Sequence, residues 1–79
     1  RVSWAGDVYK RQEYALFFLE RAKSYFYHDP ELHYLLAFIY YNKNDLKEAE
    51  KYLKTCLTVL PGYYPAKAML KQIDNKKYL

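Results

Sequence analysis

Residues that break helices are scarce in this sequence, which has three Pro and two Gly among 79 residues. A many-stranded or loop-rich fold needs more turn-forming residues than these. Leu, Ala, Lys and Glu are abundant and β-branched residues are few, which favours helices. Apolar residues make up 52% of the chain, too many for an intrinsically disordered segment. The sequence therefore predicts one small all-α unit.

The few breaking and polar turn residues divide the chain into four segments. His28–Glu31, Asn42–Asp45 and Pro61–Gly62 each interrupt an apolar pattern. Asp29 is expected to cap the second helix, with Pro30 in its first position, where the missing N–H costs nothing. Asp45 and Glu48 are predicted to form a capping box. The four predicted helices span residues 13–27, 30–42, 46–60 and 65–77.

The first dozen residues have an unusual character. Residues 7–12 resemble the translated end sequence of a transposase-based sequencing adapter, and residues 2–5 resemble the neighbouring adapter segment. We expect residues 1–12 to be non-native, and the native chain to have been cut short upstream in a bacterial, metagenomic read. A natural polar N-terminus is the alternative.

The net charge of the chain depends on this segment. The whole chain carries +4, and residues 1–12 supply +2 of it, from three basic residues and one Asp. Only +2 is left for residues 13–79. A charge this small does not support nucleic-acid binding. The longest apolar stretch, Leu32–Tyr41, is too short to span a bilayer, so no membrane association is expected.

The segment Pro30–Tyr63 carries a pattern of small and large residues on two successive helices. Small residues are suited to the place where two helices cross closely, and large residues fill the space beside them. The residues that carry this pattern are Leu36, Ala37, Tyr40, Ala49, Leu53, Cys56 and Pro61. The pattern resembles one complete tetratricopeptide repeat, whose repeat-defining packing positions these residues match. His33 departs from the family's pattern, because a Trp or another large residue is usual there.

The resemblance implies an organisation for the whole chain. Residues 13–29 would be the second helix of a truncated repeat, 30–63 one complete repeat, and 64–79 a following or capping helix. The fold class would be all-α, with antiparallel helix hairpins stacked as a right-handed solenoid fragment. The implied function is a non-enzymatic scaffold that binds a peptide or partner protein. The alternatives are a structural spacer or oligomerisation module, or repeats appended to a missing enzyme domain.

The resemblance also implies a candidate peptide-binding surface on the concave side of the second helix, at Tyr34, Phe38, Tyr41 and Asn42, and it places Glu31 on the same side. The three rings are spaced i, i+4 and i+7, so they form one stripe on a helix. The competing interpretation is that these rings pack against the neighbouring helices. Because Leu32–Tyr41 is apolar almost all round, as in a buried helix, we favour this second interpretation.

Other candidate sites are weaker. Tyr34 and Phe38 stand where some family members carry a carboxylate clamp of Lys and Asn, so no such clamp is expected. His28 and His33 lack the spacing and the further ligands of a metal site. Cys56, the single cysteine, excludes an internal disulfide and is predicted to be a small core residue. We predict no cofactor.

Truncation has a predicted consequence for stability. Without the first helix of the leading repeat, part of the expected packing is missing from four apolar residues, Tyr14, Phe17, Phe18 and Leu19. Repeat units depend on stacked neighbours, so we expect a marginally stable fragment that is prone to self-association. The compartment is left open, with the cytoplasm slightly favoured.

Overall fold

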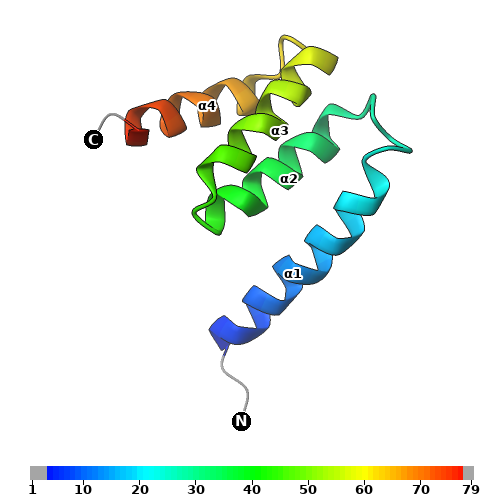
Figure 1. Ribbon diagram of the computed structural model, residues 1–79, viewed down its shortest axis with the longest axis vertical. Helices are drawn as coiled ribbons and strands as arrows, with labels where there is room; N and C mark the ends of the chain where they lie inside the picture. The colour runs from blue at the N-terminus through cyan, green and yellow to red at the C-terminus, as the bar shows by residue number, and fades with distance from the viewer. Residues whose placement is uncertain (1–3, 78–79) are drawn as a thin grey trace.

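The computed structural model describes residues 4–77, with side chains from residue 10 onward. This part of the chain contains four α-helices and no strand, as predicted. They are α1 (Trp4–Ala22), α2 (Pro30–Asn42), α3 (Leu46–Val59) and α4 (Tyr64–Lys77). Figure 1 shows α2 and α3 side by side and antiparallel, with α4 against α3 and α1 on the other side of α2. The arrangement is an all-α helical-repeat fold.

The start of α2 follows from its sequence as expected. Asp29 has extended backbone angles, and its carboxylate accepts a hydrogen bond from the Glu31 N–H at 3.0 Å. Pro30 occupies the first turn, where its lack of an N–H leaves no bond unmade. Both predictions about this cap are confirmed.

The turn between α2 and α3 is a Schellman motif. The Asp45 N–H donates to the Tyr40 carbonyl at 2.9 Å, and the Asn44 N–H donates to the Tyr41 carbonyl at 3.0 Å. Asn44 adopts the left-handed conformation with φ of 64°, which Asn tolerates better than most residues. The turn therefore reverses the chain within a few residues and brings α3 back along α2.

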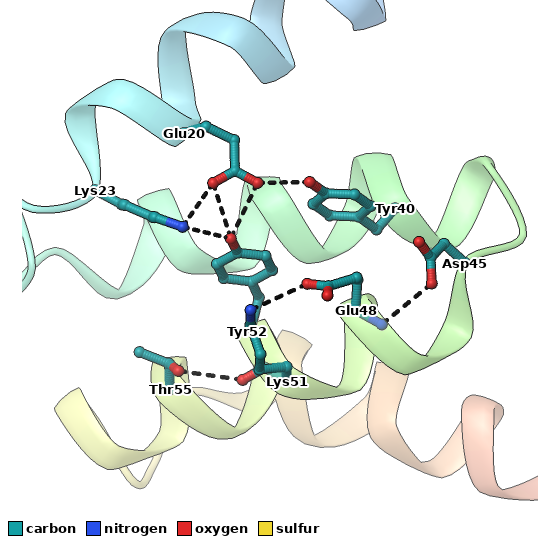
Figure 2. A network of polar contacts seen from close by, with 8 residues as sticks. All are labelled: Glu20, Lys23, Tyr40, Asp45, Glu48, Lys51, Tyr52 and Thr55. Carbon is teal, nitrogen blue, oxygen red and sulfur yellow. Dashed lines mark hydrogen bonds and ion pairs between the residues drawn. The ribbon is translucent and has the colours of Figure 1, made fainter.

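The predicted capping box at the start of α3 is only half formed. The Asp45 carboxylate accepts from the Glu48 N–H at 3.3 Å. The Glu48 carboxylate does not return to the Asp45 N–H, because that N–H is already bonded to Tyr40 in the turn. It forms an ion pair with Lys51 at 3.2 Å instead (Figure 2).

The first helix differs from its prediction at both ends. It ends at Ala22, not near Tyr27, and residues 23–28 form a series of turns. The His33 imidazole of α2 lies with Nε2 2.7 Å from the Tyr27 carbonyl oxygen, so a tertiary hydrogen bond holds the turn where the sequence carries no breaker.

At its other end, α1 begins at Trp4, inside the segment that resembles an adapter. Residues 1–3 of that segment, and the side chains of residues 4–9, lie outside the described residues. So does the chain end at residues 78–79. A helical backbone at residues 4–12 says nothing of where the segment came from, so its non-native origin stays a prediction.

The core lies between α2 and α3 and extends to α4. Ala37 and Ala49 are fully buried, and their small side chains allow α2 and α3 to approach closely. Leu36 and Leu53 fill the space beside them, and Ile73 of α4 is likewise fully buried. Among residues 10–77, the buried hydrophobic residues are Leu32, Leu36, Ala37, Ile39, Ala49, Tyr52, Leu53, Cys56, Ala66, Met69 and Ile73.

Helix α1 contributes less to this core. Leu16, Leu19 and Ala22 are only partly buried and pack against its edge. Within residues 4–77, no helix combines the length and the apolar character needed to cross a membrane.

Candidate functional site

Helix α2 exposes a narrow strip of its surface. Glu31, Leu35, Phe38 and Asn42 are all exposed, and they lie on one side because they are spaced by four, three and four residues. Leu35 is 41% exposed and Phe38 is 43% exposed. Leu35 and Phe38 are therefore two neighbouring apolar side chains that are both exposed to solvent.

Two tyrosines border this strip and are held by groups near α4. The Tyr34 ring lies 5.7 Å from the Tyr63 ring, centroid to centroid, with a tilt of 58°. The Lys76 ammonium lies 4.5 Å from the centre of the Tyr41 ring, within range of a cation–π contact. Both tyrosines are partly buried. We call Tyr34, Leu35, Phe38, Tyr41 and Asn42 the α2 face.

The sequence offered two interpretations of the aromatic stripe, an exposed binding surface or rings packed on the neighbouring helices, and each holds for part of the stripe. Tyr34 and Tyr41 pack at their edges against residues of the α4 side, whereas Phe38 is open to solvent. The favoured interpretation, in which all three rings pack against the neighbouring helices, is wrong for Phe38, and Leu35 on the same side of α2 is exposed as well. Leu35 was not a predicted site residue. Its spacing from Glu31 and Phe38 places it on their side, and this signal could have identified it.

A second arrangement of polar residues joins α1 to the α2–α3 pair (Figure 2). The Glu20 carboxylate accepts hydrogen bonds from the Tyr40 hydroxyl at 2.5 Å and from the Tyr52 hydroxyl at 2.9 and 3.0 Å. The Lys23 ammonium lies 2.6 Å from Glu20 and donates to the Tyr52 hydroxyl at 2.8 Å. The rings of Tyr40 and Tyr52 are stacked, with centroids 5.6 Å apart. We call Glu20, Lys23, Tyr40 and Tyr52 the Glu20 cluster.

The pKa values in this cluster follow from its hydrogen bonds. Burial alone would raise the pKa of Glu20, but the bonds from Lys23, Tyr40 and Tyr52 outweigh it and lower the pKa. The bonds to Glu20 and Tyr52 raise the pKa of Lys23 to about 12. Burial, followed by the bond to Glu20, raises the pKa of Tyr40 well above its ordinary value. Near neutral pH the cluster thus holds one carboxylate, one ammonium and protonated phenols.

These protonation states suit a structural role, in which the cluster holds α1 against α2 and α3. Both phenols and the Lys23 ammonium donate hydrogen bonds to the Glu20 carboxylate, and the positive charge of Lys23 balances its negative charge. Sequence reasoning did not find this cluster, because Glu20, Tyr40 and Tyr52 come from three different helices and Glu20 is 20 and 32 residues away from the two tyrosines. Tyr40, predicted as a packing residue of the repeat, is brought into it.

The remaining predicted packing residues differ in exposure. Leu36, Ala37, Ala49, Leu53 and Cys56 are fully buried, whereas Pro61 is exposed in the loop before α4. Burial raises the pKa of the Cys56 thiol, which disfavours the reactive thiolate.

The two histidines do not form a metal site with other residues. His33 is 2% exposed, in contact with the Tyr27 ring at 5.3 Å, whereas His28 is exposed. Because a carbonyl oxygen only accepts, His33 Nε2 donates the hydrogen bond to Tyr27. Among residues 10–77, no group of three or more His, Cys, Asp or Glu side chains could hold a metal ion.

The outer surface of α1 is strongly apolar. Tyr14 is 70% exposed, Phe17 57% and Phe18 73%. The Arg21 guanidinium stacks 4.2 Å above the Phe17 ring and covers part of it. An open groove of about 490 Å³ lies beside this surface, lined by Glu13, Leu16, Phe17, Glu20, Arg21 and Tyr40.

A comparison with known protein families gives one match. Residues 30–63, which comprise α2, α3 and the turn that leads to α4, match the family described as tetratricopeptide repeat. No curated protein and no solved structure matches the chain significantly. Repeats of this family generally serve as protein interaction modules and are typically non-enzymatic. The hairpin from Pro30 to Tyr63 is therefore a tetratricopeptide repeat within this all-α chain.

Proposed function

We propose that this chain binds a peptide segment of a partner protein on the α2 face. The observation that carries the proposal is the 43% exposure of Phe38 between two rings that are held in place. Exposed apolar residues of this size are costly to leave in water, and a contiguous patch of them is typical of an interaction site. The family assignment of residues 30–63 supports an interaction role in general.

The fixed tyrosines make the α2 face a favourable platform. Tyr34 and Tyr41 are already ordered by Tyr63 and Lys76, so little side-chain entropy is lost when a ligand packs on them. Aromatic side chains supply large contact areas at interfaces and often carry much of the binding energy. Asn42, exposed at the end of the face, can donate and accept hydrogen bonds with a peptide backbone.

A selection of short peptides tests the proposal. Peptides selected from a random library on the 79-residue chain are measured by fluorescence anisotropy against the chain and its Phe38→Ala variant. We expect Phe38→Ala to weaken binding roughly tenfold or more, as for a central interface residue. Phe18→Ala is the matched control, because it removes an exposed Phe ring from α1 instead. Equal binding to Phe38→Ala and the unaltered chain, with normal helicity in both, would refute the proposal.

The outer surface of α1 supports a second candidate function, self-association. Tyr14, Phe17 and Phe18 are exposed at spacings of three and four residues, so they form one apolar patch on α1, and such a patch is typical of an interaction surface. Sedimentation of the unaltered chain and of both Phe variants separates the two functions. Self-association through α1 predicts that Phe18→Ala shifts the chain toward monomer, whereas Phe38→Ala does not. A chain that is monomeric at high concentration rules out this candidate and leaves the peptide-binding proposal intact.

A further inference from the structure

The two ends of the α2 face carry opposite charges. At the start of α2, the Glu31 carboxylate is exposed beside the Tyr34–Tyr63 pair. At the other end, the Lys76 ammonium lies over Tyr41. Between these charges stand the exposed apolar side chains of Leu35 and Phe38. The α2 face is thus an apolar strip with an anion at one end and a cation at the other.

The neighbouring charges do not cancel this polarity. Asp29 adds a second carboxylate near Glu31. Burial is the main cause that raises the pKa of Tyr63, and the negative charges of Glu31 and Asp29 raise it further, as expected if both carboxylates lie near this ring. At the far end, Lys43 is paired with Glu13 at 2.6 Å, and Lys77 with Glu50 at 2.7 Å. These two pairs contribute little net charge to the strip.

The basic residues in the middle of α4 lie on a different side of that helix. At about 100° per residue, Lys67 lies roughly 180° and Lys71 roughly 140° around α4 from Lys76. Both line a separate open groove with Tyr64. Lys76 is therefore the α4 cation that faces the strip.

The length of the strip sets the length of its ligand. Glu31 and Tyr41 are ten positions apart on α2, which is about 15 Å along the helix axis. An extended peptide advances about 3.3 Å per residue, so about four or five residues cover this distance. Alternate side chains of such a peptide would point toward Leu35 and Phe38.

We propose that the α2 face selects an extended peptide in which a short apolar run is bracketed by a basic residue at one end and an acidic residue at the other. The basic residue lies at Glu31 and the acidic residue at Lys76, and the apolar run packs on Leu35 and Phe38. This inference rests on the proposed peptide-binding function and adds its specificity. Complementary charges at the rim of an interface select partners more than they add affinity.

Three labelled six-residue peptides test the inference against the full chain. Each has the same four residues, two Leu and two Ala, in its middle. Their end residues are Arg and Glu, Arg and Arg, or Glu and Glu. The unaltered chain should bind the Arg/Glu peptide tightest, by roughly threefold to tenfold over either like-charged peptide, since each exposed ion pair is modest in strength. The preference should shrink in about 0.5 M salt.

Charge variants make the expectation specific. Glu31→Lys leaves both ends basic, so the preferred peptide should become Glu/Glu. Lys76→Glu leaves both ends acidic, so the preference should move to Arg/Arg. The control Lys67→Glu makes the same charge change on another side of α4 and should keep the Arg/Glu preference. Glu31→Gln and Lys76→Gln should give intermediate preferences, and they serve if a charge reversal unfolds the chain, as judged by helicity.

The outcomes separate this inference from the function on which it rests. Equal affinity for all three peptides, with weaker binding to Phe38→Ala, would overturn the charge selection and leave peptide binding standing. Failure of all three peptides and of library-selected peptides to bind would overturn both. A preference that follows the charge at residues 31 and 76, and not at residue 67, would establish the inference.

Discussion

Replacing Glu20 with Gln tests whether the Glu20 cluster holds α1 against the rest of the fold. The carboxylate accepts hydrogen bonds from Lys23, Tyr40 and Tyr52. A glutamine side chain at this position would keep one acceptor oxygen, but its amide nitrogen could only donate, and it would face groups that also donate.

The magnitude follows from the exposure of each partner. A hydrogen bond to a charged group contributes about 1.5–3 kcal/mol when it is sheltered from water. The Lys23 side chain is 39% exposed, so its ion pair with Glu20 contributes much less, about 0–1 kcal/mol. The phenol of Tyr52, whose residue is 4% exposed, is the better sheltered partner. We therefore expect Glu20→Gln to cost about 2 kcal/mol in the free energy that keeps α1 docked.

Native-state hydrogen exchange of the α1 amides measures this docking directly, because a helix at the edge can open without global unfolding. A cost of about 2 kcal/mol corresponds to exchange roughly 30 times faster in Glu20→Gln at about pH 6.5. Glu13→Gln is the matched control on the same helix. Its partner Lys43 lies 2.6 Å away, but the Glu13 side chain is 52% exposed, so the change should stay within about twofold.

The pH dependence gives a second readout. The pKa of Glu20 is lowered in the fold from its ordinary value of 4.5, so its contribution is complete above about pH 4.5 and is lost as pH falls through the lower folded value. The difference between Glu20→Gln and the unaltered chain should therefore shrink as pH falls below this ordinary value. Equal exchange rates in the Glu20→Gln and Glu13→Gln variants near neutral pH, or a difference that persists after acidification, would refute the assignment.

Further predictions concern the core, the turns and the thiol. Leu53→Ala should lower the free energy of unfolding by about 2–5 kcal/mol, measured by urea denaturation, because Leu53 is fully buried; Leu60→Ala, at a residue 45% exposed, should cost far less. Asn44→Val should cost about 1–2 kcal/mol through its left-handed backbone, while Asn44→Gly should be close to neutral, and equal melting temperatures for both would contradict this. Gly62→Ala should stabilise the chain by about 0.4–1 kcal/mol in the same denaturation assay, since Gly62 does not have a positive φ and nothing lies within 4 Å of an added Cβ. Cys56 should react with a thiol reagent only as fast as the fold opens, so labelling at the rate of a free thiol would show that the core is not closed.

Local signals in the sequence determined the repeat hairpin. Asp29 and Pro30 start α2, the Asn42–Asp45 turn reverses the chain, and the spacing of apolar residues sets the buried side of α3. Each signal acts within a few residues, through backbone hydrogen bonds or helix periodicity, and so could be predicted without knowing the rest of the fold. The tetratricopeptide assignment of residues 30–63 follows from the same pattern.

Only the tertiary structure decided the features that depend on distant residues. His33 of α2 bonds to the Tyr27 carbonyl in the turns that follow α1, and the Glu20 cluster forms from side chains of three helices and of Lys23, the residue after α1. The exposure of Phe38, on a helix that reads as apolar almost all round, depends on where α1 and α4 lie around α2. Periodicity fixes which residues share a side of a helix, but the neighbouring helices determine which sides they cover.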